Sequence, residues 1–205
     1  MCIRDSSYYK MNLDTSNNIN FLFLHNYYYQ APCLFFKEIE EIVNTYTVDD
    51  VNNNAFDWGC NCDMDRTPVR NRDIFPYLSK NIDNLANQIG AKLKVQLNEP
   101  WINSYKKGQY QEIHDHDGHA FSSVIFLNEG VDFAEFYFVD RMIDPTPFLL
   151  KKLLKMEDLW YPKVNKGDIF IFPAHMLHGV SPHKSDVVRK TLSFNIDVLE
   201  VEPNE

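Results

Sequence analysis

The sequence predicts a mainly β fold of the α+β class, organised as one domain over residues 1–205. Runs rich in aromatic and β-branched residues, bounded by turn-forming residues, fill much of the second half of the chain and are typical of strands. Two segments in the first half instead repeat apolar residues at helical spacing. A content of 44% hydrophobic and 14% aromatic residues suits a β-rich domain with its own core.

Helices are expected to dominate residues 21–95. Residues 1–20 are polar and Asn-rich, so we expect them to be disordered or peripheral, and residues 21–24 are typical of a short strand. A helix is expected over residues 32–46, because proline is favoured at the first helical position, with apolar positions at Leu34, Phe35, Ile39, Ile42 and Val43. A second helix is expected over residues 73–90 and ends at Gly90, with apolar positions at Ile74, Leu78, Ile82, Leu85 and Ile89. These helices would pack as a buttress on the outside of a sheet.

The segment between the two helices, residues 47–72, shows no regular pattern. Irregular segments of this length are often functional, so it is a candidate pocket wall, and a solvated connector is the equal alternative. The segment contains Cys60 and Cys62, which lack further zinc ligands at recognisable spacing. Together with Cys2 and Cys33 they are interpreted as free thiols of a protein from a reducing compartment.

Strands follow in the second half of the chain. Residues 101–105 and 110–114 are expected to form a hairpin around a loop at 106–109, and residues 123–127 and 133–139 are expected to form two more strands.

An insertion at residues 141–166 separates these strands from a buried strand at 169–172. The insertion contains an amphipathic helical pattern at 148–160, flanked by prolines. This helix is interpreted either as a lid over a site or as a surface helix that packs Leu149, Leu153 and Trp160 on the core.

The last strand, residues 189–198, has one apolar and one polar face. Arg189 falls on the polar face with Thr191, while the apolar face consists of Leu192, Phe194, Ile196 and Val198. A guanidinium group beside a hydroxyl suits a carboxylate ligand, because arginine donates two parallel charge-assisted hydrogen bonds and the hydroxyl adds a third.

His114 and His116 form the only His-x-(His, Asp or Glu) pattern in the chain. In an extended strand, side chains two residues apart project from the same face with their Cα atoms about 6.5 Å apart. Two imidazoles so placed can bind one metal ion at about 2 Å per nitrogen. A catalytic metal usually takes three protein ligands and keeps other positions open, and His178, just after the strand at 169–172, is the candidate third ligand.

In this order and spacing, the motifs resemble those of the 2-oxoglutarate and Fe(II)-dependent oxygenases, whose jelly-roll core carries His-x-(Asp/Glu), a distant His and then Arg-x-Ser. The similarity covers residues 101–198 and is greatest to a branch found in bacteria and phages. The elements that carry it are Asn103, Tyr105, Gly108, His114, His116, Phe172-Pro173, His178, Arg189, Thr191 and Phe194-Asn195.

The resemblance implies a double-stranded β-helix (jelly roll, cupin-like) over residues 96–200, with the helices on the outer face of its major sheet. It implies Fe(II) bound by His114, His116 and His178, with 2-oxoglutarate and O2 as co-substrates. Arg189 would bind the distal carboxylate of 2-oxoglutarate, and further hydrogen bonds would come from Thr191, Tyr105, Asn103 and Tyr110. The expected reaction is hydroxylation of a protein side chain or small molecule, with release of succinate and CO2.

One ligand position departs from the wider family, in which it usually holds a carboxylate. Here it holds His116, and Asp115 or Asp117 would replace it if a bulge turned either inward. The histidines at 119, 175 and 183 are expected beside the site or on the surface, and His175 would replace His178 if the backbone there were displaced. His25 is expected to be structural.

Two other functions remain open. All-histidine ligation favours a three-histidine cupin-type dioxygenase that does not use 2-oxoglutarate, whereas Arg189 and Thr191 disfavour it. The third reading is a non-catalytic jelly-roll binding module or virion component, for which a closed metal site with a fourth protein ligand would be expected.

Charge and hydropathy limit the partners. The net charge is −9 and no basic stripe is present, which disfavours nucleic acid because phosphate contacts need clustered Lys and Arg. No apolar run approaches the ~20 residues of a membrane span, and the first residues lack the apolar centre of a secretory signal. We therefore expect a cytoplasmic protein.

Overall fold

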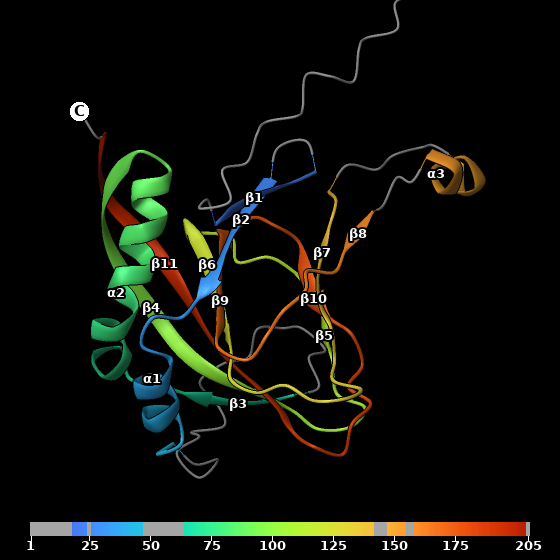
Figure 1. Cartoon of the computed structure of the whole chain (residues 1–205), viewed down its shortest axis with the longest axis horizontal. Helices are drawn as coiled ribbons and strands as arrows, with labels where there is room; N and C mark the ends of the chain where they lie inside the picture. The colour runs from blue at the N-terminus through green and yellow to red at the C-terminus, as the bar shows by residue number, and fades with distance from the viewer. Residues whose placement is uncertain (1–17, 24–25, 47–63, 142–146, 155–157, 204–205) are drawn as a thin grey trace, which may run out of the picture.

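Two antiparallel sheets that face each other make up the body of the molecule (Figure 1). The computed structural model describes residues 18–23, 26–46, 64–141, 147–154 and 158–203. The expectations for residues 1–17, His25, and the part of the irregular segment at 47–63 with Cys60 and Cys62 lie outside these ranges. The described part confirms the predicted jelly roll with helices on its outer face.

The larger sheet has seven strands in the order β1-β2-β9-β6-β11-β4-β3. Their bounds are β1 Ile19–Leu22, β2 Asn26–Pro32, β3 Asp65–Pro68, β4 Ala91–Tyr105, β6 Phe121–Phe126, β9 Asp168–Pro173 and β11 Arg189–Pro203. The smaller sheet has four strands in the order β5-β10-β7-β8. Its strands are short: β5 Gln111–His114, β7 Phe136–Val139, β8 Leu159–Trp160 and β10 His178–Val180.

Helices α1 (Phe36–Val43) and α2 (Asn71–Gln88) cover the outer face of the larger sheet (Figure 1). Four of the five apolar positions predicted for α2 are buried, namely Ile74, Leu78, Ile82 and Leu85. The helix ends as expected, because Gly90 follows it with φ +76°. Ile89 departs from the prediction: it lies beyond the last helical residue and is 40% exposed.

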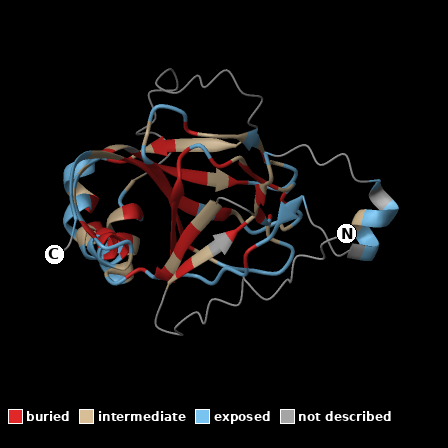
Figure 2. Ribbon diagram, turned by 90° about the horizontal axis from the view of Figure 1, so that it is seen from above, coloured by how far each residue is buried: buried red, intermediate tan, exposed pale blue. Residues whose placement is uncertain are grey.

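Two hydrophobic clusters divide the core. One lies between the helices and the larger sheet and includes Ile39, Leu78 and Phe194, and the other lies between the two sheets and includes Phe138 and Phe170. Strands β6 and β9 are buried along their whole length, because clusters lie on both of their faces. Figure 2 shows this concentration of buried residues in the strands and on the inner sides of the helices.

Strands β4 and β11 are long and pair along almost their whole length. The strand predicted from residue 101 begins ten residues later than β4 does, because Pro100 interrupts the sequence pattern. The pairing with β11 shifts register between Ser193 and Asn195, opposite this proline. A strand tolerates proline at a bulge, because no ladder hydrogen bond from the backbone N–H is required there.

The predicted hairpin at residues 101–114 is wrong. Strand β4 belongs to the larger sheet, whereas β5 pairs with β10 in the smaller sheet. The connecting turn, with Gly108 at φ +88°, instead bonds to a distant loop: Gly108 N donates to His183 O at 2.7 Å. The chain therefore crosses from one sheet to the other here, which brings β5 across from β4.

Residues 21–95 contain more strand than predicted. Pro32 ends β2 instead of beginning a helix, and α1 starts four residues later, so that Leu34 lies outside the helix and is 53% exposed. Within the segment predicted to be irregular, residues 65–68 form β3, an edge strand paired with β4.

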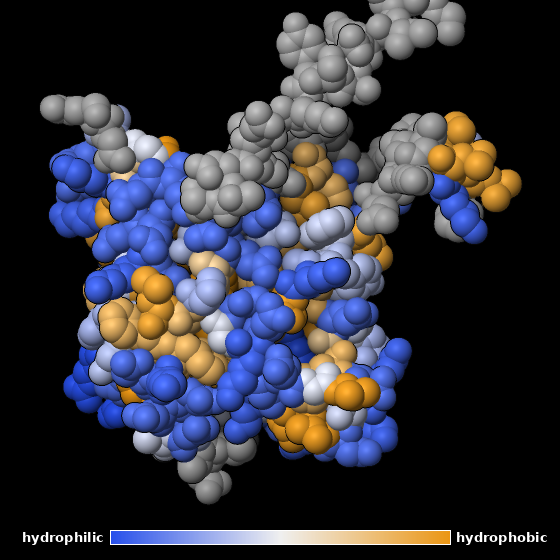
Figure 3. Space-filling view, in the orientation of Figure 1, coloured by the Kyte–Doolittle hydropathy of each residue, from blue (hydrophilic) through white to orange (hydrophobic). Residues whose placement is uncertain are grey.

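The insertion at 141–166 also differs from the prediction. Its helix, α3 (Phe148–Leu154), is shorter than expected, and β8 adds a strand to the smaller sheet. Leu149 and Leu153 are 74% and 79% exposed and Trp160 is 39% exposed, so these side chains do not pack on the core. Hydrophobic surface is accordingly visible on α3, which stands away from the two sheets (Figures 1 and 3).

Cys33 is a free thiol, buried at the end of β2, and burial raises its pKa to about 11. Within the described residues, no helix has the length and apolar character needed to cross a membrane.

Candidate active site

Three histidines from two distant parts of the chain meet between the two sheets. His114 ends β5 and His178 begins β10, and the two lie directly opposite each other across this strand pair, with ring centroids 4.3 Å apart. The ring of His116 is 5.1 Å from each of the others. One ligand atom from each histidine lies within 4.8 Å of the others, which is close enough for all three to bind one metal ion.

His116 lies beyond the end of β5, in the turn that follows it. Its backbone N–H donates to Ala174 O at 2.9 Å, and Ala174 N donates to Ala120 O at 3.1 Å. These two bonds join the turn after β5 to the turn before β10. The ring of His116 stacks near that of Trp101, with centroids 5.9 Å apart, and thus faces inward.

The two aspartates that could have replaced His116 face elsewhere. Asp115 pairs with Arg141, and Asp117 is exposed and accepts a hydrogen bond from Gly118 N. Among the described residues, the group that could bind a metal therefore consists of three histidines. Three ligands are typical of an open, catalytic metal site, since structural sites usually close with four.

The tautomers and protonation states of the three imidazoles suit metal binding. His114 Nδ1 lies 2.8 Å from Glu112 O, and His178 Nδ1 lies 2.9 Å from Met176 O. A carbonyl only accepts, so each Nδ1 carries the hydrogen and each Nε2 keeps its lone pair for a metal. Burial lowers the pKa of His114, lowers that of His116 to about 3 and lowers that of His178 well below its usual value, which keeps all three neutral.

The other described histidines do not belong to this group. His175 is exposed and bonds to Asn26, so it does not replace His178. His119 Nδ1 lies 2.8 Å from Asp197 Oδ1. His183 was expected beside the site or on the surface, but it is buried and structural: its ring accepts from Ala134 N and donates to Val187 O.

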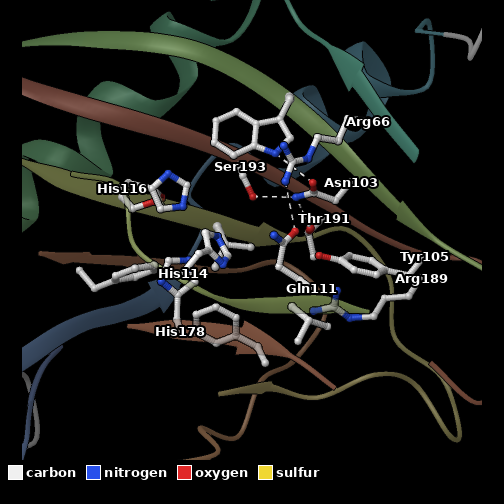
Figure 4. Close-up of a pocket in the computed structure, with 17 residues that line it drawn as sticks. Arg66, Asn103, Tyr105, Gln111, His114, His116, His178, Arg189, Thr191 and Ser193 are labelled. Atoms are coloured by element: carbon white, nitrogen blue, oxygen red, sulfur yellow. Dashed lines mark hydrogen bonds between the residues drawn. The ribbon is translucent and has the colours of Figure 1, made fainter. Parts of the chain in front are cut away.

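A row of polar side chains covers the inner face of the larger sheet across from the histidines. It arises from strand pairing, because residues opposite each other on neighbouring strands point to the same face. Thr191 on β11 lies opposite Asn103 on β4, which in turn lies opposite Arg66 on β3. Figure 4 shows these three residues and the histidines around one cavity, whose empty volume is about 440 Å³ including the part open to solvent.

Arg189 forms the deep end of this cavity. It is 3% exposed, and its guanidinium carbon lies 5.0 Å from the ring centroid of Tyr105 and 5.6 Å from that of Phe126. Its Nη1 is buried and has no hydrogen-bond partner in the described part of the chain. Because an unsatisfied buried charged donor is costly, this atom indicates a place for an anionic ligand.

Asn103 organises the neighbouring hydroxyl groups. Its Nδ2 donates to Thr191 Oγ1 at 3.2 Å and to Ser193 Oγ at 3.0 Å, while its Oδ1 accepts from Trp101 Nε1 at 2.9 Å. The amide of Asn103 is therefore committed within the protein. The two hydroxyl oxygens accept from it, so their hydrogens are directed away from it.

Part of the polar set predicted from the sequence lies around this cavity, together with residues that the sequence did not indicate. Asn103, Tyr105, Arg189 and Thr191 line it, whereas Tyr110 is not among the described lining residues and Gln111 lines it instead. Arg66 and Ser193 also line it. Ser193 shares the alternating polar face of β11 and could have been found, while no signal in the sequence places Arg66 opposite Asn103.

Comparison with known proteins agrees with this geometry. Residues 99–195 match the model of a family described as "Putative 2OG-Fe(II) oxygenase", and this segment contains the three histidines, Arg189 and Thr191. This match supports the predicted relationship to the 2-oxoglutarate and Fe(II)-dependent oxygenase superfamily. The metal and co-substrate of such an oxygenase are Fe(II) and 2-oxoglutarate, and the three neutral imidazoles and the buried guanidinium suit them. A search of curated proteins gives no match.

Solved structures share the fold of this chain at low sequence identity. The α-ketoglutarate-dependent carbocyclase SnoK from nogalamycin biosynthesis is 13% identical, with a TM-score of 0.60 over 86% of this chain and 82% of the other. HygX from Streptomyces hygroscopicus with nickel and 2-oxoglutarate bound is 13% identical, with a TM-score of 0.55 over 83% and 82%. The viral collagen prolyl hydroxylase vCPH from Paramecium Bursaria Chlorella virus-1 is 16% identical, with a TM-score of 0.52 over 82% and 94%.

Proposed function

We propose that this protein is a dioxygenase that hydroxylates a small molecule or a protein side chain and releases succinate and CO2. The observation that carries the proposal is the convergence of His114, His116 and His178 across from the buried Arg189 Nη1. We also infer a single oxygenase domain, because α2 packs on the same sheet whose strands β4 and β11 line the cavity.

The histidines are assigned as the ligands of Fe(II). Their donor set fits, since two of them have Nδ1 committed to a backbone carbonyl and all three are neutral. The bound metal and 2-oxoglutarate would supply the activation of dioxygen for oxidation of a C–H bond. The buried aromatic residues around His178, including Phe136 and Phe172, exclude water from that side of the site.

Arg189 is assigned to the distal carboxylate of 2-oxoglutarate. Its position opposite Tyr105 on the neighbouring strand fixes the guanidinium group, and the Thr191 hydroxyl lies on the same face of β11. A rigid guanidinium fork and an adjacent hydroxyl bind a carboxylate with directed hydrogen bonds. Asn103 contributes indirectly, because it holds the hydroxyl.

Binding of 2-oxoglutarate tests the proposal directly. Anaerobic protein with Fe(II) and 2-oxoglutarate should develop a weak visible charge-transfer band, and in air it should release succinate. The His178→Ala and Arg189→Ala variants should lose the band, whereas His175→Ala, which changes an exposed histidine three residues away, should keep it. Absence of the band in the wild type, or equal binding of 2-oxoglutarate by Arg189→Ala, would refute the assignment.

Ligation by three histidines favours one alternative, a cupin-type dioxygenase in which the substrate itself binds iron. Such an enzyme would have no use for the buried guanidinium of Arg189. Succinate release coupled to O2 consumption separates the two functions, since only the first produces succinate. The alternative would be supported by O2 consumption that does not require 2-oxoglutarate.

A further inference from the structure

His116 lies in a turn, so strand pairing does not fix its position as it fixes those of His114 and His178. The turn runs from His116 to His119 and closes with a hydrogen bond from His119 N to His116 O at 3.3 Å. Gly118 has φ +94° in this turn, a value that glycine adopts without strain. The position of the third candidate ligand therefore depends on how this turn is attached to the rest of the protein.

Backbone hydrogen bonds hold the two ends of the turn. At its start, His116 N donates to Ala174 O at 2.9 Å, just after β9. Just beyond its end, Ala120 N donates to Ile196 O at 3.1 Å, on β11. Two points define a line about which a turn can still rotate, so a third attachment away from this line is needed to fix it.

The side chain of His119 supplies a third attachment. Its Nδ1 lies 2.8 Å from Asp197 Oδ1, and because a carboxylate oxygen accepts, Nδ1 donates the hydrogen. Asp197 is held in turn by Asn98, whose Nδ2 donates to the other carboxylate oxygen. The side chains of His119 and Asp197 are 26% and 32% exposed, so their contact is partly shielded from water and stronger than a contact on the open surface.

This attachment joins the metal end of the cavity to the strand that carries Arg189. Asp197 lies on the same face of β11 as Arg189, because side chains alternate along the strand. Figure 4 shows His116 and Arg189 at opposite ends of the cavity. A bound 2-oxoglutarate would have to reach from the metal to Arg189, so the separation of the two ends has to be fixed. Strand β11 carries one end directly and holds the other through Asp197 and His119.

We propose that His119, through its hydrogen bond to Asp197, positions His116 for metal binding. This inference rests on the proposed function, which assigns His116 as a ligand of Fe(II). His119 itself is not part of the group of described residues that could bind the metal, so it acts through His116. Loss of a group that orients a ligand typically weakens metal binding about 10- to 100-fold. A contact that only stabilises the fold would leave the affinity of the folded protein for the metal unchanged.

Titration with Co(II) tests this inference without knowledge of the substrate. Full-length protein under argon is titrated with Co(II) in place of Fe(II), and the visible absorption of the bound ion reports both affinity and coordination geometry. His119→Leu removes the donor, so it should weaken Co(II) binding about tenfold or more and alter the visible spectrum. His119→Asn places an amide N–H near the position of Nδ1 and should restore most of the affinity and the spectrum.

Asp197→Ala removes the same hydrogen bond from the other side. It should weaken Co(II) binding as His119→Leu does, and the double variant should be no weaker than the single ones, because both changes remove one interaction. Glu200→Gln is the matched control on β11: it changes the ion pair with Lys94, at a side chain that is 61% exposed, and should bind Co(II) as wild type does. All titrations are made at a temperature where circular dichroism shows the metal-free variants to be folded.

Three results would overturn the inference: wild-type affinity in His119→Leu, equal losses in His119→Leu and His119→Asn, or additive losses in the double variant. His116→Ala separates this inference from the proposed function. If His116→Ala binds Co(II) as wild type does, His116 is not a ligand, and the proposed donor set fails together with the inference. If His116→Ala loses Co(II) and His119→Leu does not, only the role of His119 fails.

Discussion

At the scale of single residues, Asn103 determines how two hydroxyl groups face the cavity. Its Nδ2 donates to both Thr191 Oγ1 and Ser193 Oγ, so each hydroxyl oxygen acts as an acceptor on that side. Each hydroxyl hydrogen is then available to a ligand, and the hydroxyl of Thr191 shares the polar face of β11 with Arg189. We therefore expect Asn103 to influence 2-oxoglutarate binding through these two neighbours, as a positioning residue.

Asn103→Asp reverses the polarity of this contact without a change of shape. The new carboxylate accepts instead of donating, so Thr191 and Ser193 turn their hydrogens toward it and lose them for the ligand. Loss of a hydrogen bond to a charged group costs about 1.5–3 kcal/mol, so 2-oxoglutarate should bind roughly ten- to a hundredfold more weakly. Anaerobic titration of the Fe(II)-loaded protein with 2-oxoglutarate measures this loss of affinity.

Asn195→Asp is the matched control for that variant. Asn195 is also buried on β11, where its Oδ1 accepts from Ser122, but it is not among the described residues that line the cavity. An added carboxylate at this position should leave 2-oxoglutarate binding close to wild type. Equal weakening in both variants would show that buried charge, and not hydroxyl orientation, causes the loss.

At the scale of elements, β11 serves the site and the core with alternate residues. Arg189, Thr191 and Ser193 line the cavity, and Leu192 and Phe194 belong to the cluster under the helices. The helices therefore support the strand that carries these polar side chains by packing on its opposite face. Helix α2 contributes the side chains Ile74, Leu78, Ile82 and Leu85 to this cluster.

Leu78→Ala should destabilise the protein strongly, because Leu78 is 0% exposed at the centre of α2. Removal of a buried leucine side chain leaves a cavity and costs about 2–5 kcal/mol. Phe75→Ala on the same helix should cost less, since Phe75 is 37% exposed. Urea unfolding monitored by circular dichroism gives both values, and a similar loss from the two variants would contradict the assignment of the buried face.

At the scale of the whole molecule, periodicity alone predicted the apolar face of α2, the polar face of β11 and a mainly β fold. The order of the motifs, through the family resemblance, predicted the jelly roll and the histidine triad. The hairpin failed because residues 101–114 have good strand patterns on both sides of a turn, and only pairing with β10 decides which sheet β5 joins. Arg66 was missed for a similar reason. Its place in the cavity follows from the pairing of β3 with β4, and a strand of four residues is too short to show a periodic pattern in the sequence.

The geometry of the smaller sheet also predicts that metal binding stabilises the fold. The strands of this sheet contain two to four residues each, so few hydrogen bonds hold them. A metal on His114, His116 and His178 would cross-link β5, the turn after it and β10. A ligand that binds only the folded state at a hundred times its Kd adds about 2.7 kcal/mol of stability.

That gain corresponds to a rise in Tm of roughly 5–10 °C for a chain of this size. Thermal unfolding with and without Fe(II) or Ni(II) under argon should show the rise, and EDTA should reverse it. His178→Ala should abolish the rise and His175→Ala should keep it, because only the former residue belongs to the triad. Hydrogen exchange should slow upon metal binding in β5 and β10 more than in α2, since the cross-link constrains the smaller sheet. A uniform change across the molecule, or an equal rise in His178→Ala, would place the metal elsewhere.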